Sequence, residues 1–295
     1  MSKIKLYYWA LKRLFESDVR AGLDFMNLRE KLYENIIFNY LLRYIPKKVD
    51  QGLRKKNLVG IPVFQYWSTG LDNAPEIVRF CVNSVKKNTL NMHHIEINDM
   101  NFDQFVEVPA QIKTKYAKGK ISPTHFSEIL RFALLSNYGG FWIDSTVYLS
   151  GEIENYARDP FFAFSTTPKY LMGDEKLSFS SWFLYSERNG IYVQYIYQML
   201  INYWLSEGRY LHRYYLHYCM THVLKALNKD KNITTNDFES NVLSHYLQIE
   251  LQEKTHVERL KTIVAKTKVH KLSYYSILKE HQEKYFRNFQ MLRFL

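Results

Sequence analysis

The stretch LLSNYGGFWIDSTVYLSGEI, residues 134–153, decides how this sequence folds. Two glycines, Gly139 and Gly140, stand directly before an apolar strand, Phe141–Ile143, which runs into the carboxylate of Asp144. In open α/β sheets, ligands bind outside the carboxyl ends of the strands. Asp144 therefore stands where a ligand would be held, and the competing interpretation is a carboxylate that caps the following turn.

The segment before the glycines, SPTHFSEILRFALLSNY, predicts a helix over residues 123–138. Ser122 is the expected N-cap, Pro123 fits the first helical position, and the two glycines end the helix. Apolar side chains recur at helical spacing on one face, which is expected to dock on a sheet. The opposite, polar face carries Thr124, Ser127, Glu128 and Arg131.

Further strands flank this unit along the chain. IPVFQYW (61–67) and HHIEIN (93–98) precede it, and FFAFS (161–165) and SSWFLYS (180–186) follow it. Strands that alternate with helices at this spacing indicate an α/β sheet with parallel strands. Residues 189–205 and 211–227 have helical periodicity, so we expect the C-terminal half to be largely helical.

The first 56 residues have a helical pattern of apolar side chains and are predicted to form a separate helical segment. Residues 4–15 show helical apolar spacing with interleaved lysine and arginine, and a second helical run spans 23–44 and stops at Pro46. A basic connector over 47–56 then marks a boundary, which gives domains 1–56 and 57–295. The basic amphipathic helix over 4–15 either lies on an anionic membrane surface or packs on the domain formed by residues 57–295.

The length, composition and net charge of the chain indicate a globular protein with an anionic partner. The chain has 295 residues, of which 46% are hydrophobic and 16% aromatic, so it is not disordered. Two widely separated cysteines, Cys81 and Cys219, suggest a reducing compartment, and we expect a cytoplasmic protein. A peripheral position at the inner face of the plasma membrane is the alternative. The net charge of +11 suits nucleic acid, a phospholipid surface or a phosphorylated small molecule.

The polar residues near Asp144 favour the phosphorylated small molecule. An arginine and two acids around one site suit a sugar diphosphate, because sugar hydroxyls need donors and acceptors and a leaving diphosphate needs positive charge. A hard divalent cation, Mg²⁺ or Mn²⁺, would serve that leaving group. The competing interpretation of Glu128 and Arg131 is a surface ion pair at helical spacing.

Two stretches resemble a known family. IPVFQYWSTGLDNAPEIVRFCVNSVKKN (61–88) and ISPTHFSEILRFALLSNYGGFWIDSTVYLS (121–150) look like the capsular polysaccharide synthesis proteins, bacterial relatives of the DXD-containing family-32 glycosyltransferases. The likeness continues in order to about residue 275. It implies a GT-A fold, which is a Rossmann-like nucleotide-sugar-binding sheet flanked by helices. It also implies a nucleotide-sugar donor of the UDP type, a divalent metal, Mn²⁺ or Mg²⁺, and transfer with retention at the anomeric carbon.

The resemblance also assigns roles to individual residues. Asp144 matches the first acid of the DXD motif and is the expected metal ligand, while Glu128 and Arg131 match positions that hold the donor sugar. His270 and Lys271 stand where a C-terminal metal ligand and a phosphate contact are expected. The remaining donor-binding candidates are Gln65, Tyr66, Trp67, Ser127, Ser181 and Trp182.

The sequence departs from the family motif at its second acid. The motif here is Asp-Ser-Thr, so Thr146 takes the place of a carboxylate and weakens the expected metal site. His270 could compensate, because imidazole tolerates Mn²⁺ better than Mg²⁺, although a surface histidine is an equal alternative. His217 lies in an aromatic helix and is predicted to be structural.

These patterns predict a retaining hexosyltransferase of capsule or lipopolysaccharide assembly, acting on a saccharide or lipid-linked saccharide acceptor. One alternative is a scaffold that keeps the fold but is catalytically weakened, because the second acid is absent. The other alternative is a basic nucleic-acid-binding protein. That alternative is disfavoured because the lysines outside the 47–56 connector are scattered instead of forming a stripe, so no nucleic-acid partner is expected.

Overall fold

The computed structural model describes residues 23–49, 56–157, 160–166, 179–227, 239–274 and 279–295. The chain divides into two compact units, residues 1–40 and 41–295. In the first unit the described part is one helix, α2 (Leu23–Leu41), which continues into a 3-10 turn, Leu42–Tyr44, ahead of Pro46. The predicted helical run over 23–44 is thus confirmed, whereas the predicted helix over 4–15 lies outside the described residues.

The second unit is built on a five-stranded mixed sheet with the order β2-β1-β3-β6-β5. Strands β1, β2 and β3 are mutually parallel, whereas β6 runs antiparallel to both of its neighbours, β3 and β5. The predicted α/β sheet is confirmed, and the reversed β6 is a feature that the sequence pattern did not indicate. The strands are β1 (Pro62–Tyr66), β2 (His93–Ile97), β3 (Gly140–Ile143), β5 (Phe161–Ser165) and β6 (Phe179–Ser186).

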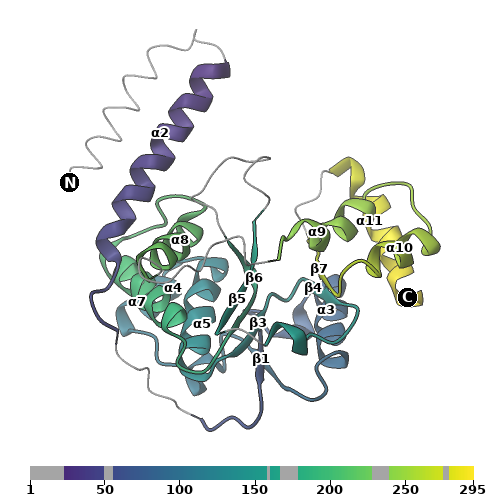
Figure 1. Ribbon diagram of the computed structural model, residues 1–295, viewed down its shortest axis with the longest axis horizontal. Helices are drawn as coiled ribbons and strands as arrows, with labels where there is room; N and C mark the ends of the chain where they lie inside the picture. Colours follow the sequence, from purple (N-terminus) through teal and green to yellow (C-terminus); the bar gives the residue numbers. More distant parts are fainter. Residues whose placement is uncertain (1–22, 50–55, 158–159, 167–178, 228–238, 275–278) are drawn as a thin grey trace. The chain divides into compact units, whose positions relative to one another are not determined.

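Helices cover both faces of this sheet (Figure 1). Helices α5 and α7 pack on each other on one face, with α4 and α8 beside them, and α3 lies on the other face (Figure 1). The helices are α3 (Glu76–Lys87), α4 (Ala110–Ala117), α5 (Pro123–Tyr138), α7 (Ile191–Ser206) and α8 (Tyr215–Leu227). Short 3-10 turns cover Leu71–Asn73, Phe102–Gln104, Glu154–Tyr156 and Leu292–Phe294.

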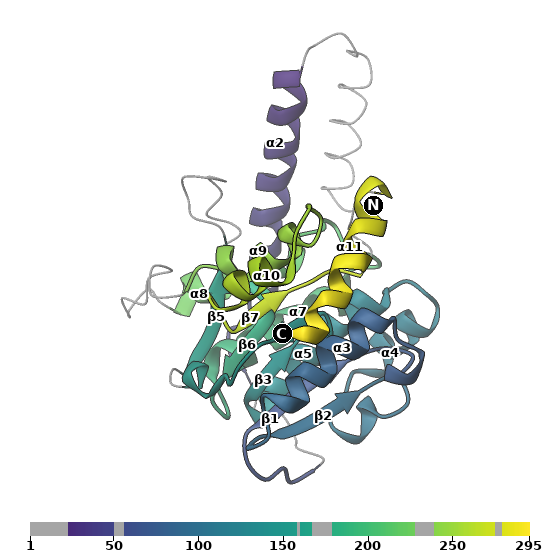
Figure 2. The same ribbon diagram turned by 90° about the vertical axis from the view of Figure 1, so that its right-hand side faces the viewer.

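A second, two-stranded sheet joins the middle of the chain to its C-terminal part. Strand β4 (Val147–Leu149) pairs antiparallel with β7 (Val269–Lys271). Around it lie α9 (Val242–Glu250), α10 (Val257–Val264) and α11 (Lys279–Met291), and α11 runs beside α3 (Figure 2). The pairing of β4 with β7 matters for function because β4 begins three residues after Asp144.

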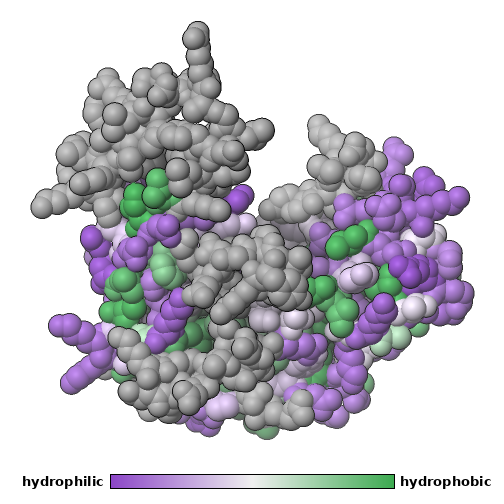
Figure 3. Space-filling view, turned by 45° about the horizontal axis from the view of Figure 1, so that its top comes forward, coloured by the Kyte–Doolittle hydropathy of each residue, from purple (hydrophilic) through white to green (hydrophobic). Residues whose placement is uncertain are grey.

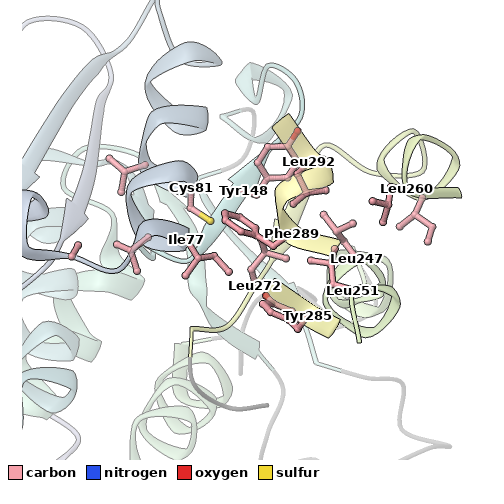
Figure 4. Close-up of a cluster of buried hydrophobic side chains, with 14 residues drawn as sticks. Ile77, Cys81, Tyr148, Leu247, Leu251, Leu260, Leu272, Tyr285, Phe289 and Leu292 are labelled. Carbon is pink, nitrogen blue, oxygen red and sulfur yellow. The ribbon is translucent and has the colours of Figure 1, made fainter. Parts of the chain in front are cut away.

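Two clusters of buried apolar side chains pack against the two faces of the β4–β7 sheet. Tyr148 and Leu272 join a cluster formed with α3 and the C-terminal helices, in which Ile77, Cys81 and Phe289 also take part (Figure 4). On the opposite face, Val147, Leu149 and Val269 join the core of the main sheet. Burial of apolar surface on both faces therefore fixes the position of β7 relative to β3.

The residues just before β3 explain how this strand reaches its position at the centre of the sheet. Ser122 Oγ accepts the His125 amide at 3.3 Å and Pro123 opens α5, as predicted, and the helix ends where Gly139 takes a φ of 68°. Gly140 follows with a φ of 83°, and a Cβ there would lie 2.2 Å from the Pro62 carbonyl oxygen. Only glycine allows β3 to approach β1 this closely.

Hydrophilic side chains predominate over the C-terminal helices, on the right in the space-filling view, with apolar side chains between them (Figure 3). In the part of the chain that the structure describes, no helix combines the length and the apolar character needed to cross a bilayer.

Candidate functional site

The site lies at the carboxyl ends of β1 and β3. The parallel register pairs Phe64 with Trp142, which brings Tyr66 level with Asp144. The turn after β3 is tied on both sides, because Ser145 Oγ donates to the Tyr66 carbonyl at 2.8 Å and the Asp144 amide donates to the Trp182 carbonyl at 2.8 Å. The backbone of Asp144 is therefore fixed between β1 and β6 before any side chain is considered.

The carboxylate of Asp144 accepts three side-chain hydrogen bonds. Arg131 Nη2 lies 3.0 Å and Trp142 Nε1 lies 2.9 Å from Oδ1, and Lys271 Nζ lies 3.3 Å from Oδ2. Its side-chain bonds thus go to other elements, which argues against the interpretation of Asp144 as a cap of its own turn. Burial alone would raise the pKa of Asp144, but Arg131, Lys271 and Trp142 together lower it below the usual value. Asp144 is ionised at neutral pH.

Arg131 is held by the ring of Trp142 as well as by Asp144. Its side chain is only 5% exposed, and the guanidinium carbon lies 5.0 Å from the ring centroid of Trp142. A guanidinium stacks well on an aromatic face and stays charged when buried. Its Nε is buried and has no hydrogen-bond partner among the described residues. The predicted alternative, an exposed pair with Glu128, does not describe this buried residue.

Glu128 lies one helical turn before Arg131 but is held differently. Its Oε2 accepts a hydrogen bond from the Tyr215 hydroxyl of α8 at 2.5 Å. Burial raises the pKa of Glu128 to about 7, the Tyr215 bond and Arg131 oppose the rise, and Asp144 adds to it. Glu128 is therefore close to half-protonated at neutral pH, unlike Asp144.

Tyr215 belongs to a cluster of aromatic rings, and we call His125, Trp204, Tyr210 and Tyr215 the aromatic wall. Trp204 Nε1 donates to the Tyr215 hydroxyl at 3.1 Å, so this hydroxyl accepts from Trp204 while it donates to Glu128. The His125 ring centroid lies 4.5 Å from that of Tyr210 and 5.7 Å from that of Tyr215. The rings hold the hydroxyl whose hydrogen bond opposes the rise in the pKa of Glu128.

Lys271 reaches the other side of Asp144 from β7. The β4–β7 register pairs Lys271 with Val147, and its ammonium lies 2.5 Å from Thr146 Oγ1 as well as 3.3 Å from Asp144 Oδ2. The side chains of Lys271 and Asp144 are 20% and 26% exposed, so a ligand in solvent can reach both. The structure therefore brings the predicted phosphate contact and the predicted DXD acid together.

His270 does not join them, contrary to the prediction that it shares a metal with Asp144. Successive residues of a strand point to opposite faces, and Lys271 takes the face toward Asp144. The His270 ring is buried, stacks on Tyr148 with centroids 5.5 Å apart, and places Nε2 3.1 Å from Ser150 Oγ. Burial lowers the pKa of His270 to about 4, so the ring is neutral.

The donor set at Asp144 does not fit a divalent cation. One carboxylate, which already accepts from two cationic side chains, faces one hydroxyl and one ammonium. Hard cations need several oxygen ligands and negative charge. Within the described ranges, no group of three or more His, Cys, Asp or Glu is arranged to hold a metal ion. The expected Mn²⁺ or Mg²⁺ stays a prediction that these side chains do not favour.

Three of the predicted donor-binding residues lie at the end of β1, and their side chains have different surroundings. Gln65 is buried and its Oε1 lies 2.8 Å from His94 Nε2. The Tyr66 hydroxyl donates to Asp99 Oδ1 at 2.6 Å. The Trp67 ring is half-buried and lies edge-on to Tyr274, with centroids 5.3 Å apart. Only Tyr66 contacts the turn after Asp144, through its carbonyl.

The other donor-binding candidates are also spread out. Ser127 Oγ donates to the Thr124 carbonyl of its own helix at 2.6 Å. The Trp182 ring is buried and stacks on Phe164 at 5.1 Å, so its backbone, not its ring, contacts Asp144. Ser181 is half-exposed on β6.

Sequence reasoning missed two residues of the site. Trp142 and Tyr215 supply hydrogen bonds to the two acids, and Tyr215 is 87 positions from Glu128, a separation that leaves no local signal. That His217 is structural stays a prediction, and the ring lies within the electrostatic reach of Arg131 and Asp144. Burial and then Arg131 lower its pKa to about 4, and its Nδ1 has no hydrogen-bond partner among the described residues.

A separate cavity of about 430 Å³ lies at the amino-terminal end of β1 and β3. Pro62, Gly140 and Arg188 are among its lining residues, and none of the predicted site residues lines it. Ligands of open α/β sheets bind at the other end of the strands. The residues around Asp144 are therefore the better candidate.

Comparison with known proteins gives one family. A family model described as "Capsular polysaccharide synthesis protein" matches residues 19–289. A search of curated protein sequences gives no match. A solved structure described as "PaToxG Glycosyltransferase" is similar at 14% identity over 89% of this chain and 92% of that chain, with a TM-score of 0.38. A structural likeness this weak carries no argument about function.

Proposed function

The chain belongs to the capsular polysaccharide synthesis protein family, and from this premise we propose that it is a glycosyltransferase that uses a nucleotide-sugar donor. The observation that carries the proposal is the ionised Asp144 at a strand end, between Arg131 and Lys271 and open to solvent. A carboxylate can accept from sugar hydroxyls, and the two cations can stabilise a leaving diphosphate. This combination serves sugar transfer in one place.

The finer assignment concerns donor and stereochemistry. The donor is a UDP-linked hexose and the acceptor is a saccharide or lipid-linked saccharide of capsule or lipopolysaccharide assembly. Retention requires the acceptor hydroxyl and the leaving phosphate to lie on one face of the sugar. Asp144 is stabilised as an anion by its three donors, which makes it a poor nucleophile. We therefore favour front-side displacement, in which the departing phosphate accepts the proton of the acceptor.

The two acids divide the recognition of the sugar. Asp144 is always an acceptor, because it is ionised. Glu128 can accept when ionised and donate when protonated, since its pKa is about 7. Arg131 has a buried Nε–H without a partner among the described residues, which suits a sugar or phosphate oxygen. These groups orient a donor without forming a covalent intermediate.

The proposal is tested by a screen of nucleotide sugars for hydrolysis and transfer. We expect turnover of at least one UDP-sugar, and a loss of about hundredfold or more in kcat/KM for Asp144→Asn, because the sugar hydroxyls lose an ionised acceptor and Arg131 and Lys271 lose the carboxylate that positions them. Asp103→Asn is the matched control, since Asp103 pairs with Lys113 on the surface. Retained nucleotide binding without turnover of any donor would point to the weakened scaffold instead.

Membrane association is a separate proposal that follows from the acceptor. A lipid-linked saccharide would lie at an anionic membrane surface, and residues 4–15 carry the basic amphipathic pattern suited to it. Cosedimentation with anionic liposomes, before and after deletion of residues 1–20, tests this. Equal sedimentation of both proteins would remove the membrane role without touching the sugar-transfer proposal.

A further inference from the structure

A lysine lies where the sequence motif calls for a metal. The two positions that the DXD resemblance assigns to acids are Asp144 and Thr146, and the Lys271 ammonium lies against both, 3.3 Å from Oδ2 and 2.5 Å from Oγ1. Lysine offers three N–H donors and no acceptor. Two donors are accounted for by these bonds, and the third has no partner among the described residues.

A divalent cation at this point would meet unfavourable neighbours. Thr146 gives a neutral oxygen, and the charge of Asp144 is already shared by Arg131 and Lys271. A second cation placed on Asp144 would lie within a few ångströms of the Lys271 ammonium and would be repelled. The Lys271 ammonium supplies positive charge where a metal would supply it. Its pairing with Asp144 leaves little negative charge to attract a metal ion.

The fold holds Lys271 in this position. Its strand is paired with β4, which begins immediately after Thr146, and the Leu272 amide donates to the Thr146 carbonyl at 2.9 Å. Apolar residues bury both faces of the β4–β7 sheet. A cation held by a rigid element stabilises developing charge without reorganisation, which is the requirement for an electrostatic catalyst.

We propose, building on the function proposed above, that Lys271 is the resident cation of this site and that the chain binds a nucleoside diphosphate and transfers sugar without a divalent metal. In the transfer step the bond between the anomeric carbon and the phosphate oxygen breaks, and its electron pair goes to the diphosphate. Lys271 neutralises that charge through its remaining N–H. The acceptor oxygen bonds to the anomeric carbon, and its proton passes to the diphosphate.

The first test is calorimetry of UDP binding to the full chain, in EDTA and then with Mn²⁺ or Mg²⁺. We expect the dissociation constants to agree within about twofold, because the cation is covalently part of the protein. Binding that appears only with metal would overturn the inference and leave the proposed function standing. Absence of UDP binding in every condition would remove both. This comparison uses the unaltered protein and depends on no variant folding.

The second test replaces the cation. We expect Lys271→Met to weaken UDP binding in EDTA by about tenfold or more, since a charge-assisted contact is lost while the aliphatic stem is kept. Lys271→Arg keeps the charge and is expected to retain binding within a few-fold. Lys268→Met is the control, an exposed lysine just before the same strand. Equal affinity of Lys271→Met and wild type would overturn the inference.

Discussion

Asp144 and Glu128 are two acids of one site, and their surroundings treat them in opposite ways. Around Asp144, at the strand end, two cationic side chains and an indole N–H overcome the effect of burial and lower the pKa. Around Glu128, on the aromatic wall, one phenol and a more distant arginine do not, and the pKa rises to about 7. The number of charged donors, not the type of acid, decides which carboxylate is ionised.

This contrast gives the site one half whose charge is constant and one half whose charge depends on pH. The constant half suits the leaving diphosphate through the cations Arg131 and Lys271, and it suits a sugar hydroxyl through the ionised Asp144. The variable half, with Glu128 and Tyr215, suits a sugar hydroxyl, for which either a donor or an acceptor serves. The predictions that follow test this division.

The largest expected effect is the difference between Asp144→Asn and Glu128→Gln. We expect kcat/KM of nucleotide-sugar turnover to fall by about hundredfold or more for Asp144→Asn and by less than about tenfold for Glu128→Gln, because glutamine keeps the hydrogen bonds of a protonated glutamate. The Glu128→Gln deficit should be smaller near pH 6 than near pH 8. Equal losses at both pH values would break the comparison.

Building a metal site at the constant half tests whether Lys271 keeps a metal ion out of it. The double variant Thr146→Asp, Lys271→Ala supplies two carboxylates two residues apart and removes the ammonium. We expect Mn²⁺ to strengthen UDP binding to this variant by about tenfold or more, and to leave wild type unchanged. Calorimetry with and without EDTA measures both. A wild-type response to Mn²⁺ as large as that of the variant would show that Lys271 does not exclude the metal.

A smaller effect is expected when the phenol is removed from the variable half. The Tyr215 hydrogen bond lowers the pKa of Glu128, so Tyr215→Phe should raise it above its value of about 7. Carboxyl ¹³C NMR titration of Glu128 measures the shift, and Tyr210→Phe is the control, because no hydrogen bond joins Tyr210 to Glu128 in the described residues. An unchanged or lower pKa would contradict the role given to Tyr215.

The smallest effect concerns stability. Because the folded state raises the pKa of Glu128 from 4.5 to about 7, the folded protein binds more protons than the unfolded chain between these values. The stability from this group is complete below pH 4.5 and is lost as pH rises through about 7. We expect the free energy of unfolding of wild type to fall relative to Glu128→Gln over this interval in urea titrations. A difference that is flat with pH would argue against a raised pKa.

The parts of the fold that local sequence encodes were predicted well. The cap at Ser122, the opening Pro123, the end of α5 and the strands of the main sheet follow from spacing and turn chemistry. Asp144 and Arg131 were found because the end of a strand and one face of a helix can be read from the sequence. Partners from distant segments could not be found in this way, and Tyr215 of α8 is such a partner.

His270 shows a different limit. The family resemblance implied a metal ligand at His270 and a phosphate contact at Lys271, yet adjacent residues of a strand face opposite sides. Had 269–271 been recognised as a strand, only one of the two could have been assigned to the site. Val269–Lys271 is three residues long and shows no alternation of apolar and polar side chains, so only the pairing with β4 identifies it as a strand.

The most direct test of the account is a crystal structure of the full chain with UDP, grown in the presence of a chelator. The account predicts diphosphate oxygens within hydrogen-bonding distance of the Lys271 ammonium, with Asp144 and Arg131 lining the space where the sugar would follow. A nucleotide bound elsewhere, such as the cavity beside Gly140 and Arg188, would contradict it.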